Sequence, residues 1–459
     1  MGSLNGSLNI ALGSLEANRG AIEVTSNNIA NVNTAGYSRE QINLSENPPV
    51  QIGNQLFGTG VSLGQTTSVR SNLLEVQLDQ ANSSSGSLNS FLGAMNQVQT
   101  LVNETAGTGL QTPLSAFYNS LTQLTTDPTN SSYRQGVVTA GQNLSAAFQQ
   151  DTSNLKSLQS NTDLGVVQSV SQINQLTQQI AGLNVQISNQ VSLGQDAGTF
   201  QDQRTQLLRQ LSGLVGISET QAGNGSLTIA TSSGAALVDG SQSFALTTQI
   251  NPNSTYQDVY SNGTNITSSI SGGTLGGQIQ ARDQAIPTVL TQLDTLAYNI
   301  ETSVNTQSKA GFDANGKAGV NFFTQPTSVA GAASTMGVAI TDPNLVAASS
   351  DGSVGSSGNA QALANLQNQT SVNGQTPYNY YSNMVFQVGN QVSQAKNEQT
   401  AVGLSQQQLS NQRGAISAVN LDEEAVNLVK YQSAYQASAN VINVINTLLT
   451  TTMNMNVGG

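Results

Sequence analysis

The sequence contains no cysteine, no histidine and no tryptophan. Without cysteine no disulfide bond can form, and without cysteine or histidine the common zinc sites are excluded. The same absences exclude serine–histidine triads and cysteine nucleophiles that depend on a histidine base. Carboxylate chemistry stays possible, because the chain carries 25 aspartate and glutamate residues.

Charge is also scarce, since only 8% of the residues are charged. The net charge is −12, and the 13 lysine and arginine residues are scattered along the chain. Nucleic acids and anionic membrane surfaces attract clusters of basic residues, so we expect neither as a partner. Hydroxyl and amide side chains make up much of the remainder, which suits packing against many copies of the same chain. A soluble secreted protein would have the same composition.

The chain has no long hydrophobic run. Its N-terminus lacks the basic region and apolar stretch of a secretory signal peptide, and no segment is long enough to span a bilayer. If the protein leaves the cell, we therefore expect export without a cleaved signal. At 459 residues the chain is long enough for two or three domains, each with its own core.

An apolar repeat with a period of seven residues occupies the C-terminal end. It consists of Leu421, Leu428, Tyr435, Ile442 and Leu449. This period is typical of a coiled coil, in which each apolar side chain fits between side chains of a partner helix. We place the companion positions of the seam four residues later, where the chain has Ala425, Gln432, Ala439, Asn446 and Met453. The two polar companions, Gln432 and Asn446, would set the register at a cost in stability.

The N-terminal end shows a matching repeat of Leu8, Leu15, Ile22 and Ile29. Gly13 and Gly20 weaken this helix by about 1 kcal/mol each, so a partner has to stabilise it. The polar face carries acidic residues and a single arginine, which favours a partner helix over a membrane surface. The core of an ordinary helix bundle is the alternative explanation of both terminal repeats. We expect the turn that leaves the helix to be shaped by Asn28, Asn31, Asn33 and Gly36.

Between the ends, helical spacing is interrupted by a strand- and turn-like stretch at 37–65, by a β-prone segment at about 222–277 and by a loop-rich stretch at 311–354. Helices are predicted at about 73–102, 110–124, 131–214 and 278–307, and again from about 384 to the end. The predicted fold is mainly α, an elongated multi-domain protein with terminal coiled-coil helices, a central helical bundle and a small inserted β domain that is looped out. The predicted domains are 1–65, 66–220, 221–279, 280–414 and 415–459, where the first and last form one terminal domain and 66–220 and 280–414 form the helical bundle.

No motif indicates catalysis or a bound cofactor. Asp313, Asn315 and Gly316 resemble the start of a calcium loop, but the later ligands of such a loop are missing, which favours a plain turn. Asp422, Glu423 and Glu424 could form an acidic cluster, but they fit better in the first turn of the last helix. We therefore expect no catalytic, cofactor-binding or metal-binding residues.

Several strings of residues resemble those of bacterial flagellar axial proteins, the family of rod, hook and hook-associated proteins. The stretch from Ser26 to Arg39, SNNIANVNTAGYSR, is similar to their N-terminal signature, and VNLDEE at 419–424 with YQSAYQA at 431–437 is similar to their C-terminal signature. Interior strings narrow the resemblance to the hook-associated FlgK family. They are LSAFY at 114–118, DP at 127–128, RQ at 134–135, DQR at 202–204, LGG at 275–277 and RDQ at 282–284.

The resemblance implies a structural role in the flagellum. Members of this family form a homo-oligomeric ring at the junction between hook and filament. The partners that it implies are the hook protein, a second hook-associated junction protein on the filament side, and a FlgN-type export chaperone that holds the C-terminal helix. It also implies an extracellular location, reached through the flagellar type III export apparatus, and terminal helices that become ordered on assembly.

Three other readings stay open. The chain could be a hook or distal rod subunit of the same axial family, although the interior strings argue against this. It could be an extracellular adhesin, because β domains exposed on filaments bind surfaces, but residues 222–277 offer few aromatic side chains for a carbohydrate site. It could be an enzyme, although no constellation of residues supports one.

Overall fold

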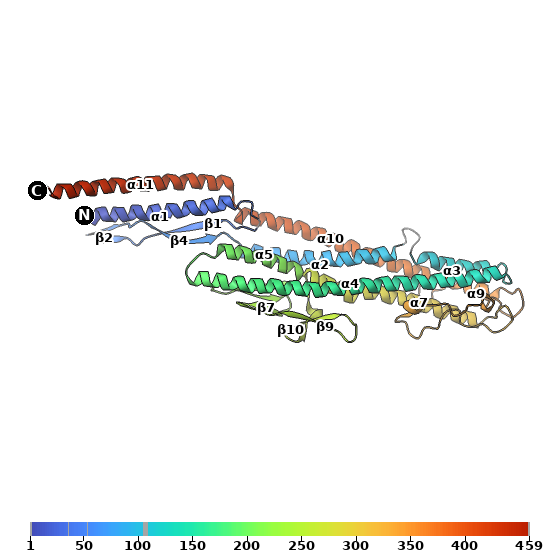
Figure 1. The fold of residues 1–459 in the computed structure, drawn as a ribbon. Helices are drawn as coiled ribbons and strands as arrows, with labels where there is room; N and C mark the ends of the chain where they lie inside the picture. Colours follow the sequence, from blue (N-terminus) through green and yellow to red (C-terminus); the bar gives the residue numbers. More distant parts are fainter. Residues whose placement is uncertain (1, 35, 53, 104–108, 458–459) are drawn as a thin grey trace.

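The computed structural model describes residues 2–34, 36–52, 54–103 and 109–457. The molecule is a long rod built mainly of helices that run along its axis, and both chain termini lie at the same end (Figure 1). The α-helices are α1 Gly2–Ala30, α2 Asn72–Val102, α3 Gln111–Leu124, α4 Ser131–Ser192, α5 Gly198–Leu214, α6 Gly273–Gln280, α7 Ile286–Lys309, α8 Ala332–Thr335, α9 Gly358–Asn365, α10 Pro377–Ser417 and α11 Leu421–Val457. A π-helical segment, Ala281–Ala285, joins α6 to α7.

The strands form four small antiparallel sheets. Near the N-terminus, β1 (Glu40–Glu46) pairs with β4 (Val61–Ser68), and β2 (Val50–Ile52) pairs with β3 (Gln55–Phe57). The β-rich insert follows α5 and has a four-stranded and a three-stranded sheet. Its strands are β5 Ile217–Gln221, β6 Leu227–Thr231, β7 Ala236–Asp239, β8 Gln242–Ser243, β9 Leu246–Ile250, β10 Gln257–Ser261 and β11 Thr264–Asn265. Strand structure thus begins at Ile217, slightly before the predicted boundary, and helix resumes at Gly273 inside the segment predicted as β.

The longest predicted helix, 131–214, is two helices in the structure. Its start is fixed by Asn130, whose side chain accepts hydrogen bonds from the backbone amides of Ser132 and Tyr133. At the other end of α4, Gly194 adopts a φ of 69°, in the left-handed region that favours glycine, and the chain turns back into α5. The predicted helical stretch is therefore divided by a turn, whose position an apolar period does not reveal.

Two hydrophobic cores lie one after the other along the rod. The larger core joins α3, α7 and the first halves of α4 and α10, and contains Phe117 against Phe322 and Phe323 with ring centroids 5.6 and 5.4 Å apart. The second core joins the later half of α4, α5 and α6 to the strands of the insert, with Ile180 and Ile229 fully buried. The insert therefore packs along α4 and shares its core, which corrects the expectation that it is looped out as a separate domain.

Helices α2 and α10 lie side by side, and polar pairs recur along their contact. Gln406 donates a hydrogen bond to Asn82 at 2.8 Å, and Arg413 pairs with Glu75 at 2.6 Å. Gln399 donates to Asn89 one heptad earlier. Between Ala395 and Ser417 no residue of α10 is buried. The second half of α10 is thus held by amide and ionic pairs rather than by an apolar seam.

Candidate assembly interface at the chain ends

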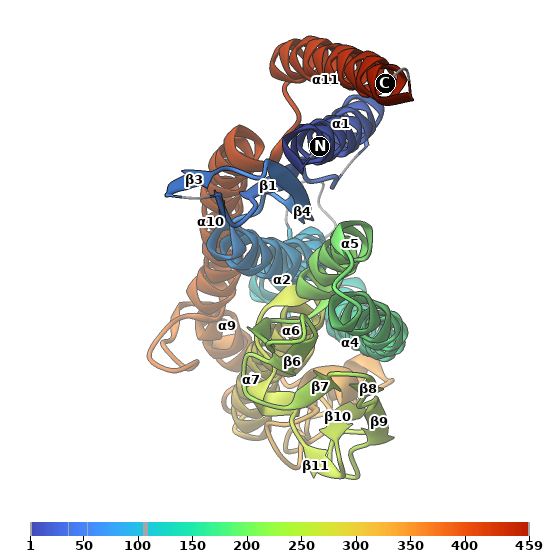
Figure 2. The same ribbon diagram turned by 90° about the vertical axis from the view of Figure 1, so that its left-hand side faces the viewer.

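The first and last helices of the chain pack against each other at one end of the rod. Helices α1 and α11 run antiparallel and side by side, beyond the end of the body formed by α2 to α10 (Figures 1 and 2). Ser14 and Ser438 share a hydrogen bond of 2.9 Å between their hydroxyl groups. These residues are 424 positions apart in the sequence, so the pairing brings the two terminal repeats together within one chain.

The predicted N-terminal seam residues lie at the edge of this contact. Leu8, Leu15, Ile22 and Ile29 are each half-buried. The fully buried positions of α1 are instead small or polar side chains, namely Ala11, Ala17, Ala21, Thr25 and Asn28. Small side chains let two helices approach closely, which explains why α1 buries alanine where the repeat predicts leucine and isoleucine.

The predicted C-terminal seam residues face α1 along most of α11. Leu428, Tyr435, Ile442 and Leu449 are half-buried, whereas Leu421 is 49% exposed. Their buried companions, however, lie three residues later and not four, at Glu424, Ser438 and Ile445. Of the predicted companions, Ala439 is half-buried, and Ala425, Gln432, Asn446 and Met453 are exposed.

The shift of the companion positions has a chemical reason. Ser438 is buried because it finds the hydroxyl of Ser14, and Glu424 is buried against Thr25 and Asn28. Burial raises the pKa of Glu424, although the interaction with Asn28 acts in the opposite direction. A polar side chain is tolerated in a helix contact only when a partner satisfies it. The choice between the two companion positions therefore depended on residues at the other end of the chain.

A second apolar stripe lies on the face of α11 that points away from α1. It comprises Val426, Val429, Val441, Val444 and Leu448, which are 47% to 69% exposed. At about 100° per residue these side chains fall on one side of the helix, opposite the seam. We call this set the outer stripe. After Lys430 the helix carries no charged residue.

On another side of α1 lies the two-stranded ribbon of β1 and β4 (Figure 2). The two glycines that weaken α1 face this ribbon. A Cβ atom at Gly13 would stand 2.8 Å from the backbone oxygen of Val61, and one at Gly20 would stand 2.9 Å from Leu63 Cδ1. These glycines therefore allow the helix to lie directly on the ribbon.

The predicted turn residues lie in the last turn of α1 and in the segment that follows it. Asn28 is buried, donates to the backbone oxygen of Glu40 at 2.9 Å, and accepts from the Glu40 amide and the Tyr37 hydroxyl, both at 2.9 Å. Asn31 donates to the backbone oxygen of Asn27 at 3.0 Å, and Asn33 is exposed. Gly36 has a φ of 85°, a left-handed conformation that favours glycine. Asn28 thus ties the end of the helix to the first strand.

We call α1, the ribbon of β1 and β4, and α11 the terminal unit. Ionic contacts and hydrogen bonds attach the terminal unit to the body formed by α2 to α10. Asp202 on α5 accepts hydrogen bonds from the hydroxyl of Ser38 at 2.9 Å and from Arg70 at 2.8 Å. Burial raises the pKa of Asp202, although the nearby Arg70 lowers it. The backbone amide of Arg39 donates to the oxygen of Ser417 at 2.8 Å, and its side chain pairs with Glu423 at 3.1 Å.

A second ionic group joins three helices of the body beside this junction. Glu75 on α2 receives Arg413 from α10 at 2.6 Å and Arg209 from α5 at 2.7 Å. Burial acts to raise the pKa of Glu75, but the hydrogen bonds from the two arginines outweigh it and leave the pKa below its ordinary value. Sequence reasoning missed these charged residues. Their scarcity in a chain with 8% charge was the available signal.

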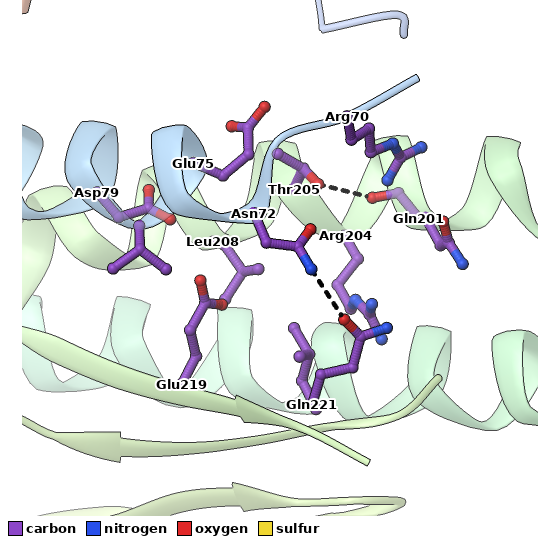
Figure 3. Close-up of a pocket in the computed structure, with 12 residues that line it drawn as sticks. Arg70, Asn72, Glu75, Asp79, Gln201, Arg204, Thr205, Leu208, Glu219 and Gln221 are labelled. Atoms are coloured by element: carbon purple, nitrogen blue, oxygen red, sulfur yellow. Dashed lines mark hydrogen bonds between the residues drawn. The ribbon is translucent and has the colours of Figure 1, made fainter. Parts of the chain in front are cut away.

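A pocket of about 200 Å³ opens next to Glu75, between α2, α5 and β5 (Figure 3). Asp79 and Glu219 line it, together with Arg204 and several amide side chains. Asp79 is buried and accepts a hydrogen bond from Ser212 at 3.0 Å. Burial, and secondarily the charge of Glu219, raises the pKa of Asp79 to about 7. These groups join the insert to the body.

The remaining acidic motifs have structural partners. The carboxylate of Asp313 accepts hydrogen bonds from the backbone amides of Asn315 and Lys317, both at 2.8 Å, as in a tight turn. Asp422, Glu423 and Glu424 occupy the first turn of α11. Across the described part of the chain, no group of three or more acidic side chains is arranged to hold a metal ion. Nor does any helix there combine the length and apolar character that crossing a membrane requires.

Comparison with known protein families matches three segments of the chain. Residues 95–323 match the helical domain of the flagellar hook-associated protein FlgK. Residues 8–37 match the flagella basal body rod protein family, and residues 412–455 match the C-terminal family of the basal body rod proteins FlgEFG. The two shorter matches cover most of α1 and α11, and the long one covers much of the body.

Curated relatives align with nearly the whole chain. Flagellar hook-associated protein 1 of Bacillus subtilis is 28% identical, with 98% of each chain covered. The protein of the same name from Escherichia coli is 27% identical, with 98% of this chain and 99% of the relative covered. Among solved structures, the hook junction protein FlgK from Burkholderia pseudomallei has the same fold, with a TM-score of 0.66 at 18% identity over 74% of this chain and 100% of that one. The chain therefore belongs to the FlgK family of flagellar hook-associated proteins, which are structural components of the bacterial flagellum.

Proposed function

We propose that this chain forms the junction between the flagellar hook and filament, and that it does so by self-assembly through its terminal helices. The outer stripe of α11 carries the proposal. A helix with apolar side chains on two opposite faces needs a partner on each face, and α1 covers only one of them. Exposed apolar patches of this kind mark interaction sites in soluble proteins.

The identity of the partner follows from charge. The outer stripe lies on a helix that has no charged residue after Lys430, in a chain whose net charge is −12. Copies of an acidic chain repel one another, and this repulsion is smallest where the facing surfaces carry no charge. The assembly residues in this proposal are the outer stripe together with both predicted seams, that is Leu8, Leu15, Ile22, Ile29, Leu421, Leu428, Tyr435, Ile442 and Leu449, and the turn formed by Asn28, Asn31, Asn33 and Gly36.

In this proposal the chain acts outside the cell as a structural subunit and not as an enzyme. A ring of copies would contact the hook protein on one side and a second hook-associated protein on the other. Before assembly the outer stripe is an aggregation hazard, because no described part of the monomer covers it. A FlgN-type chaperone bound to α11 during export through the flagellar apparatus would remove that hazard.

The test is a charge placed on the outer stripe. Val444→Asp adds a carboxylate at a side chain that is 58% exposed, so the α1–α11 contact keeps its own residues. We expect cells that carry only this variant to show bare hooks in electron micrographs and flagellin lost to the medium. Asn443→Asp is the matched control, because it adds the same charge to an exposed neighbour outside the stripe.

Each other outcome points to a different reading. Normal filaments in the Val444→Asp cells would contradict assembly through the outer stripe. Cells that lack the gene and have no hooks at all would move the chain to the hook or distal rod. Intact, motile filaments in such cells would favour the adhesin reading.

A further inference from the structure

The tip of the ribbon, which comprises residues 48–52 and 54–58 with strands β2 and β3, stands away from the rest of the molecule. Every described side chain in this segment is exposed. Three of them are large and apolar, namely Val50 at 52%, Leu56 at 71% and Phe57 at 47% exposure. Figure 2 shows β3 projecting to one side of α1 rather than lying along it.

Both faces of the tip are apolar. Val50 pairs with Phe57 and Gln51 pairs with Leu56 in the antiparallel register. Since successive side chains of a strand point to opposite faces, Phe57 and Leu56 lie on different sides. A flat surface could cover only one of them. The tip is therefore suited to insertion between elements of a partner.

The base of the tip is closed by hydrogen bonds. The amide of Asn47 donates to the oxygen of Gly60 at 2.9 Å, and the Thr59 hydroxyl donates to the oxygen of Pro48 at 2.8 Å. Gly60 has a φ of 92° and lies close against Ile10 of α1. The base of the tip is thus anchored in the single chain, which lowers the entropic cost of docking.

The backbone of the tip is also available. Among the described strands, β2 and β3 pair only with each other, so each has one open edge. An isolated two-stranded hairpin is at best marginally stable in water, and open edges can accept a further strand or be covered by a neighbour.

The absence of charge favours a copy of the same chain as the partner of the tip. From Asn47 to Val69 the chain has no charged residue, although the whole chain carries −12. A partner chosen by opposite charge would require charged residues on this surface, whereas an uncharged surface lets a copy of the same acidic chain approach with little repulsion. The ribbon packs on α1, which packs on α11, so the tip belongs to the same unit as the outer stripe.

We propose that the β2–β3 tip inserts into an adjacent copy of this chain in the assembled ring. The proposal rests on the proposed self-assembly and names a second contact in it, separate from α11. Leu56 and Phe57 are the anchors, and the open strand edges supply backbone contacts.

The experiment is site-specific photocrosslinking in the intact flagellum. Leu56 is replaced by p-benzoylphenylalanine in cells that carry no other copy of the gene, and isolated flagella are irradiated and immunoblotted. We expect a crosslinked dimer of this chain, with the second attachment site identified by mass spectrometry. The same substitution in a Leu428→Asp background, which disrupts the terminal helix pair, should lose the dimer, because that chain is released unassembled.

The outcomes separate the two proposals. Assembled flagella in which position 56 crosslinks only within its own chain, or to a different flagellar protein, would overturn the tip contact and leave self-assembly standing. A dimer that persists in the secreted Leu428→Asp chain would also overturn it, because the contact would not depend on the ring. If the chain with its natural Leu56 were absent from isolated flagella, both self-assembly and the tip contact would be overturned.

Discussion

At the scale of single residues, two glycines in α1 have different surroundings despite their equal place in the heptad. Gly13 faces a backbone oxygen of the ribbon, whereas Gly20 faces the end of the Leu63 side chain. Backbone cannot move aside without disturbing the strand, but a half-exposed leucine can change rotamer. Glycine lowers the helix propensity at both positions, but close packing against the ribbon requires it only at Gly13.

We expect Gly13→Ala and Gly20→Ala to change the stability of α1 in opposite directions. Alanine is better than glycine in a helix by about 1 kcal/mol, but overpacking against Val61 costs about 1–3 kcal/mol. Gly13→Ala should therefore destabilise the helix, and Gly20→Ala should leave it unchanged or stabilise it. Hydrogen exchange of residues 2–30, measured by mass spectrometry in both variants and in the unaltered chain, compares the stability of α1 in the three proteins. Equal protection in both variants would contradict the role assigned to the Val61 contact.

At the scale of elements, the joint between α2, α5 and β5 contains carboxylates that burial keeps from ionising easily. Asp79 points into the pocket shared with Glu219, as the side chains in Figure 3 show. Arg209, whose charge acts to lower the pKa of Asp79, forms its ion pair with Glu75 instead. Asp79 is thus left with the hydroxyl of Ser212 as its hydrogen-bond donor in the described structure.

This arrangement predicts that stability falls as the pH rises. Burial raises the pKa of Asp79 from its ordinary value of 3.8 to about 7 in the folded chain, so the folded state binds the proton more tightly. The stabilising effect of that proton is fully present below about pH 4 and is lost as the pH rises to about 7. We expect Asp79→Asn to reduce this part of the pH dependence and to raise stability at pH 8, by at most about 4 kcal/mol. Urea unfolding at pH 5 and pH 8 gives the free energy of unfolding of the variant and of the unaltered chain. The same change in this free energy between the two pH values in both proteins would contradict the prediction.

At the scale of the whole molecule, the rod divides into a body with its own cores and a terminal unit with little core of its own. All residues of the two main cores lie between Phe91 and Ala395. The terminal unit buries mostly small and polar side chains, and it leaves apolar residues exposed on α11 and on the ribbon tip. We therefore expect its stability to depend on partners, as the proposed assembly through it would require.

We expect a truncated chain of residues 70–417 to fold without the terminal unit. Because both cores remain, its thermal unfolding midpoint should lie within a few degrees of the main transition of the full chain. Differential scanning calorimetry of the two proteins makes the comparison. A truncated chain that does not unfold cooperatively would show that the ionic junction at Asp202 and Ser38 is needed by the body as well.

Much of this architecture was predictable from local patterns. The bounds of α2 and α3 agree with the apolar spacing, and the strings at both ends and in the interior identified the family. The prediction failed where a distant segment decided the outcome. Contacts between elements that are far apart in the chain determine three features: the chain reversal at Gly194, the packing of the insert against α4, and the ionic group at Glu75.

By itself the sequence determined that both ends are helices with a heptad repeat, because a periodic pattern of apolar residues specifies a face of a helix. Only the tertiary structure decided which residues contact each face of these helices. Glu424 and Ser438 became the buried companions because α1 offers Asn28 and Ser14 to them, across more than 390 residues of chain. A buried polar group needs a hydrogen-bond partner, and a local sequence pattern does not reveal which residue that partner is. The outer stripe and the ribbon tip are the apolar surfaces that these contacts leave exposed.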